Sequence, residues 1–131
     1  MPEHVKVNNE LEIIEIQSEG DISEADLYTA LNKVMSLYKS TGISLLLCDT
    51  RTQQSLPAIG AYKRFIEQIP RSITIAVLLS ATGRTSNLQH FGEVVASQTT
   101  TFYKTFYEQS KALQWLRDMS GLRKSALPKS E

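Results

Sequence analysis

Polar residues that could bind an anion follow two of the strands expected in this 131-residue chain. They supply a carboxylate, hydroxyl groups and two guanidinium groups, and they are Asp49, Thr50, Arg51, Thr82, Arg84 and Ser86. Guanidinium groups beside the free amides of a helix attract phosphate-like or carboxylate groups. Loops that follow parallel strands emerge at one edge of a sheet, so Arg51 and Arg84 would approach one crevice if their strands are neighbours. Loop capping by Asp49 and an ordinary turn at residues 80–87 are the alternative interpretations.

The sequence lacks most catalytic and metal-binding patterns. A thiol phosphatase needs an arginine where Gln54 stands, so Cys48 is interpreted as a small buried residue at a strand end. Residues 80–87 lack the lysine and the second glycine of a phosphate-binding P-loop, and no Gly-x-Ser-x-Gly motif marks a hydrolase. His4 and His90 have no cysteine or carboxylate at ligand spacing. We therefore expect no enzymatic activity, no metal and no cofactor.

Composition and charge exclude further classes of protein. The sequence pI of about 6.7 argues against nucleic-acid binding, for which a pI above about 9 is typical. Eight acidic residues and one lysine fall within residues 1–27, which predicts an acidic end of the fold against a mildly basic remainder. The apolar runs at residues 43–48 and 75–79 are far too short to span a bilayer. With a single cysteine and no signal-peptide pattern, we expect a cytoplasmic protein that is not an integral membrane protein, as a monomer or a homodimer.

Strand-like segments recur about every 30 residues, which is the length of one βαβ unit. They cover residues 11–17, 43–49, 72–79 and 102–107. The second and third are almost continuously apolar, as expected of parallel strands with both faces covered by helices. Residues 4–7 alternate before a turn pair and are expected to add an antiparallel edge strand. The sequence therefore predicts an α/β domain with a small, open, mainly parallel sheet of four to five strands and helices on both faces.

Helix signals lie between these segments. Ser23 with Asp26 three residues later is typical of a capping box, and Gly42 fits just past the end of that helix. The sequence of residues 55–57, Ser-Leu-Pro, predicts the start of a second helix with Ser55 at its N-cap. A third helix is expected from about residue 86.

The last helix carries an apolar stripe at helical spacing, formed by Ala112, Trp115, Leu116 and Met119. Trp115 is therefore interpreted as a packing residue, and the helix is expected to stop at residues 120–121, Ser-Gly. One domain over residues 1–121 and a disordered tail over residues 122–131 follow from this assignment.

Four segments carry a resemblance to a known family, namely residues 19–26, 45–51, 75–78 and 106–116. Their order resembles the STAS domain family, and more closely its SpoIIAA-like branch, which is structurally akin to CRAL-TRIO lipid-binding domains. The resemblance implies a non-catalytic regulatory module that acts through a protein partner. A module that binds a small anion or a lipid at the strand ends is the alternative.

The resemblance also draws attention to Ser55 as a candidate phosphorylation site. In anti-sigma-factor antagonists, a serine within an Asp-Ser-Ser/Ala-Gly motif at the start of a helix is phosphorylated, and this blocks partner binding. Residues 52–57 lack that motif, but Ser55 stands at an expected helix start. The fold would tolerate a phosphate there, because the dipole of a helix favours negative charge at its N-terminus, so only partner binding would change.

Overall fold

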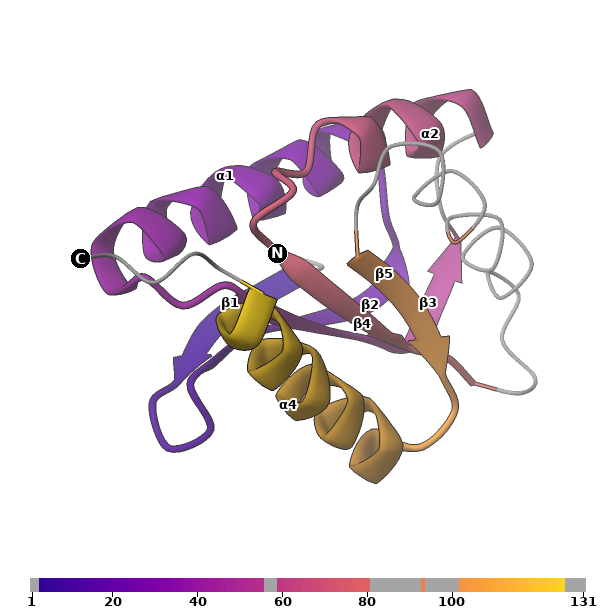
Figure 1. Ribbon diagram of the computed structural model, residues 1–131. Coiled ribbons are helices and arrows are strands. Elements are labelled where there is room, and N and C mark those ends of the chain that lie inside the picture. The colour runs from indigo at the N-terminus through magenta and orange to yellow at the C-terminus, as the bar shows by residue number, and fades with distance from the viewer. Residues whose placement is uncertain (1–2, 56–58, 81–92, 94–101, 127–131) are drawn as a thin grey trace.

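The computed structural model describes residues 3–55, 59–80, 93 and 102–126. Its elements in chain order are β1 (Glu3–Asn8), β2 (Ile13–Asp21), α1 (Glu24–Thr41), β3 (Leu45–Ser55), α2 (Ile59–Glu67), β4 (Thr74–Leu78), β5 (Phe102–Phe106) and α4 (Gln109–Ala126). The strands form one sheet in the order β1-β2-β3-β4-β5, in which β1 pairs antiparallel with β2 and all other pairs are parallel. Helices α1 and α2 cover one face of the sheet and α4 covers the other (Figure 1). The predicted α/β fold class and the antiparallel edge strand are confirmed.

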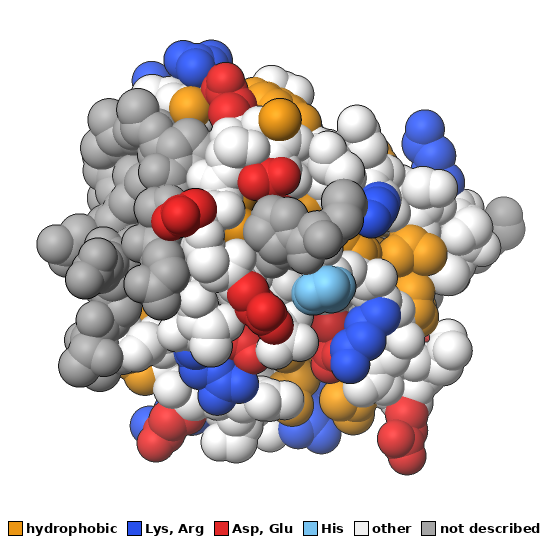
Figure 2. Space-filling view, turned by 180° about the vertical axis from the view of Figure 1, so that it is seen from behind, with side chains coloured by type: hydrophobic (Ala, Val, Ile, Leu, Met, Phe, Trp, Pro, Cys, Tyr) orange, Lys and Arg blue, Asp and Glu red, His pale blue; other side chains and the backbone are white. Residues whose placement is uncertain are grey.

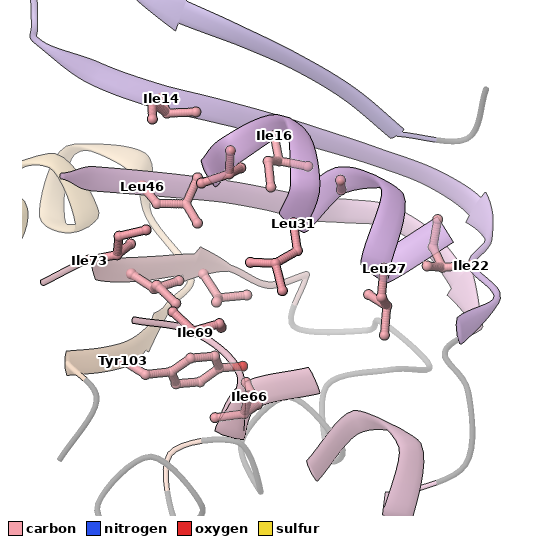
Figure 3. Close-up of a cluster of buried hydrophobic side chains, with 14 of the residues drawn as sticks. Ile14, Ile16, Ile22, Leu27, Leu31, Leu46, Ile66, Ile69, Ile73 and Tyr103 are labelled. Carbon is pink, nitrogen blue, oxygen red and sulfur yellow. The ribbon is translucent and has the colours of Figure 1, made fainter. Parts of the chain in front are cut away.

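Apolar continuity in the strands fills two hydrophobic layers, one on each face of the sheet. On β4, Ile75 and Val77 pack under α1 and α2, while Ala76 and Leu78 pack against α4. All five residues of β4 are buried because helices cover both faces of this strand, which lies between β3 and β5. Figure 3 shows the larger layer, which joins side chains of the sheet to α1 and α2.

Local signals set the ends of α1 as predicted. The backbone N–H of Asp26 donates to Ser23 Oγ at 3.1 Å, and the backbone N–H of Ser23 donates to Asp26 Oδ2 at 2.9 Å, which completes a capping box. Gly42 ends the helix with a φ of 75°, a left-handed conformation that glycine adopts without strain. Among the described residues, no helix is both long enough and apolar enough to cross a membrane.

Two elements extend further than predicted. β3 continues through residues 49–55, which the sequence predicted as a loop, because β2 pairs with it as far as Asp21 opposite Ser55. The pairing of β3 with β4 ends earlier, at Asp49 opposite Leu78, so this extension belongs to a two-stranded ribbon and keeps a polar sequence. The loop prediction for residues 49–55 was therefore wrong.

The last helix also passes its predicted stop. α4 runs through Gly121 to Ala126, because a single glycine disfavours a helix by only about 1 kcal/mol and does not by itself end it. The expected tail therefore begins no earlier than residue 127, and residues 127–131 lie outside the described part of the chain. The third predicted helix, except Glu93, also lies outside it.

Candidate functional site

Asp49 and Arg51 form a two-pronged ion pair on β3. The Nε and Nη2 atoms of Arg51 donate to Oδ1 and Oδ2 of Asp49 at 2.9 and 2.8 Å. Burial alone would raise the pKa of the Asp49 carboxyl, but the hydrogen bonds and charge of Arg51 outweigh it and hold that pKa below its usual range. Because this carboxylate neutralises the guanidinium of Arg51, the predicted anion site loses one of its two cations.

Thr50 lies on the opposite face of the sheet from this ion pair, because successive residues of a strand alternate in direction. Its side chain is 9% exposed, and its Oγ1 donates a 2.6 Å hydrogen bond to the backbone carbonyl of Leu78. Leu78 is the last residue of β4 to pair with β3, so Thr50 holds the two strands together where they part. The expectation that Thr50 supplies a hydroxyl to the same crevice as Arg51 was therefore wrong, because a strand and not a loop carries these residues.

We expect Thr50→Val to lower the free energy of unfolding by about 0.5–1.5 kcal/mol, the usual net contribution of one hydrogen bond. The change keeps the shape of the side chain and removes only the donor to Leu78. Urea unfolding followed by circular dichroism would measure it, with Thr50→Ser as the control that keeps the hydroxyl. Equal midpoints for the wild type and Thr50→Val would show that this bond adds nothing to stability.

A cavity of about 50 Å³ lies between the sheet and the helices α1 and α2. Its walls are largely apolar, and its polar lining consists of Glu3, Ser18, Cys48, Thr50, Gln53 and the Tyr103 side chain. Since a water molecule needs roughly 10–15 Å³ in this measure, the cavity has room for only a few non-hydrogen atoms. A lipid chain needs far more space.

Glu3 is the most unusual group in this cavity, and sequence reasoning missed it. It stands opposite Ser18 in the ladder, is 8% exposed, and its Oε2 accepts a hydrogen bond from Ser18 Oγ at 2.9 Å. Oε1 is buried and has no hydrogen-bond partner among the described residues. Burial raises the pKa of the Glu3 carboxyl, Ser18 opposes that rise and the charge of Asp26 adds to it. The alternation of the strand could have predicted that Glu3 is buried, because Glu3 shares its strand face with Val5 and Val7, which pack on the core.

Cys48 lines the same cavity as a protonated thiol. Burial raises the pKa of the Cys48 thiol far above its ordinary value, and the nearby charges of Glu3 and Asp49 raise it further. The thiolate is the reactive form of cysteine, so this residue is inert as a nucleophile. This agrees with its interpretation as a small residue packed into the sheet.

A second, polar groove of about 130 Å³ lies on the α4 side of the sheet. Lys6, Glu15, Gln17, Asp49 and Gln109 supply its polar lining. Lys6 and Glu15, which are cross-strand neighbours, form an ion pair of 3.5 Å.

Acidic and basic side chains are interspersed on the face shown in Figure 2, and hydrophobic side chains are scattered there. Within the described ranges, no group of three or more His, Cys, Asp or Glu residues could hold a metal ion.

Several solved structures resemble this arrangement of elements. One is an uncharacterized protein of the DUF3478 family with a SpoIIAA-like fold from Shewanella loihica PV-4, with a TM-score of 0.60 and 15% identity over 87% of this chain and 91% of that one. The chain has a SpoIIAA-like fold. Another is an anti-sigma factor antagonist from Mycobacterium paratuberculosis, with a TM-score of 0.61 and 12% identity over 88% of this chain and 93% of that one. No family model and no curated protein matches the chain.

Of the remaining predicted site residues, the structure describes Ser55 and does not describe Thr82, Arg84 and Ser86. Ser55 ends β3, and α2 begins only at Ile59, so the prediction that Ser55 caps a helix was wrong. The sequence just before Ser55 is polar, as in a loop, because this part of β3 pairs with β2 and not with β4. A phosphate on Ser55 would therefore join a strand end and lack the helix dipole.

Proposed function

We propose that this protein is a non-catalytic regulatory module that acts by binding another protein. The observation that carries the proposal is the SpoIIAA-like fold, shared along 88% of the chain with a protein named an anti-sigma factor antagonist. That name describes a protein that opposes the action of another protein. The proposal extends this mode of action, and not the particular partner, to the present chain.

The chemistry of the described residues favours binding over catalysis. The Cys48 thiol is held in its protonated form, and the Asp49 carboxylate is engaged by Arg51. Acyl or phosphoryl transfer needs a nucleophile and a base within hydrogen-bond reach of each other. Two hydroxyl–carboxylate pairs occur in the described part of the chain, Ser18 with Glu3 and Thr105 with Glu93. The first pair is buried, and in the second the carboxylate also accepts the backbone N–H of Thr105. We therefore propose no enzymatic activity for the protein.

We place the partner surface at the extension of β3. The pairing of β3 with β4 ends at Asp49, which lies opposite Leu78, and β3 continues beyond that point. Arg51 and Thr52 are exposed on this extension. The ion pair with Asp49 fixes the Arg51 side chain in one direction, so less conformational entropy would be lost when a partner binds. Thr82, Arg84 and Ser86 remain predicted members of the same edge. A cytoplasmic location and the absence of nucleic-acid binding remain sequence-based predictions.

Binding of an anion or a lipid is the second candidate, and the described residues give it less support. Arg51 already has a carboxylate partner, and the cavity beneath α1 is too small for a lipid chain. One observation does favour a ligand of a different kind, namely the unsatisfied carboxylate oxygen of Glu3.

Affinity purification with the tagged full chain, followed by titration of the recovered partner, tests the proposed function. Arg51→Glu should weaken binding about tenfold or more, which corresponds to about 1.4 kcal/mol, because it replaces the ion pair with two adjacent acids. Lys33→Glu is the matched control, since Lys33 is exposed on α1, away from β3. Equal affinities for Arg51→Glu and the wild type would remove this surface from the proposal, and recovery of no protein partner would contradict the function itself.

A further inference from the structure

The polar end of the cavity beneath α1 places a buried carboxylate against apolar walls. Glu3 of β1 and Ser18 of β2 are paired across the antiparallel ladder, and both side chains lie on the face of the sheet that α1 and α2 cover. Figure 3 shows Ile16 of β2 and Leu31 of α1, which line the same cavity. The cavity thus joins one acidic group to an apolar space of about 50 Å³.

No cation balances the charge of Glu3 within the described part of the chain. Its Oε2 accepts a hydrogen bond from the neutral Ser18 hydroxyl, and Oε1 has no partner there. The other charged side chain that acts on it is Asp26, which is also acidic. Buried carboxylates in proteins are normally paired or fully hydrogen-bonded, because an uncompensated buried charge is costly. The site therefore lacks a positively charged hydrogen-bond donor.

We propose that the cavity beneath α1 is a binding site for a small primary ammonium compound, whose head group donates to Oε1 of Glu3 and whose short alkyl chain lies against Ile16, Leu31 and Val77. The head group supplies both the missing charge and the missing donor. The volume admits roughly three to five non-hydrogen atoms, judged by the space that one water needs. This site is independent of the partner surface on β3 and of the proposed function.

Three ligands of matched size test the charge requirement. Propylammonium, 1-propanol and propionate are titrated separately into the isotopically labelled full chain, and amide shifts are followed by NMR. Propylammonium is expected to bind with a dissociation constant on the order of millimolar, as suits so small a ligand, and to shift the amides of Ser18, Ala30 and Thr50. 1-Propanol and propionate should bind at least tenfold more weakly. Equal binding of 1-propanol, or no binding of propylammonium, would overturn the proposal.

Two variants locate the site. Glu3→Gln removes the charge at almost constant shape and should weaken propylammonium binding tenfold or more, whereas Glu10→Gln, in the exposed turn after β1, should leave it unchanged. Ala30→Leu keeps the carboxylate and fills the cavity from α1, so it should also abolish binding, which provides a second test if Glu3→Gln does not fold. Unchanged affinity in either folded variant would place the ligand elsewhere and contradict the assignment.

Discussion

Leu116→Ala is expected to lower the free energy of unfolding by about 2–5 kcal/mol, the range for removing a large aliphatic side chain from a core. Leu116 is 1% exposed and belongs to the hydrophobic layer between α4 and the sheet. Among the described residues, the buried members of that layer are Ile13, Leu47, Ala76, Leu78, Ala112 and Leu116, and Leu45, Phe106, Leu113 and Trp115 pack against them. Neighbouring side chains can fill only part of the space that the leucine leaves.

Denaturant unfolding of the full chain measures this effect. Arg117→Ala is the matched control, because Arg117 is the next residue of α4 and is exposed. Trp115→Ala should cost less than the ~3–5 kcal/mol of a fully buried aromatic residue, since Trp115 is only partly buried. Its ring lies 5.7 Å from that of Phe106, centroid to centroid, which supports its interpretation as a packing residue. Equal midpoints for Leu116→Ala and Arg117→Ala would show that α4 is not docked through this layer.

The sequence was sufficient to predict the architecture because burial on both faces of a strand leaves a plain signal. The almost continuously apolar residues 74–78 form the buried strand β4, and the capping box at Ser23 marks the start of α1. These signals are local, since each depends on residues that are close together in the chain. The fold class and the helix cap could therefore be predicted.

The candidate site depended on contacts that are distant in the chain, and it could not be predicted in the same way. Whether residues 49–55 form a loop or a strand depends on their pairing with β2, from which the whole of α1 separates them along the chain. The same register decides that Thr50 and Arg51 lie on opposite faces of the sheet. Likewise, Glu3 is buried only because β1 pairs with β2 and α1 covers that edge.

The pH dependence of stability should reveal the unpaired charge of Glu3. In the folded state, the pKa of this carboxyl is raised above its ordinary value of 4.5, mainly by burial. A raised pKa means that the folded protein binds the proton more tightly than the unfolded chain. The contribution of Glu3 is therefore most favourable below the unfolded pKa, and it is lost as pH rises through the folded pKa. The wild type should thus carry a penalty from Glu3 at pH 7 that is absent at pH 4.

Glu3→Gln should remove the charge and make the protein more stable than the wild type at pH 7, by on the order of 1 kcal/mol, because desolvating a charged group costs more than desolvating a neutral one. The amide oxygen can still accept the hydrogen bond from Ser18 Oγ. The amide nitrogen takes the place of Oε1 and leaves a neutral polar group there without a partner, so the gain reports the charge alone. Urea unfolding at pH 4, 5.5 and 7 measures the difference, which should shrink towards pH 4, and Glu10→Gln should show no such trend. If Glu3→Gln were instead less stable at pH 7, the carboxylate would have to be stabilised by a cation from outside the described residues. The proposed ammonium site would then already be filled by the chain itself.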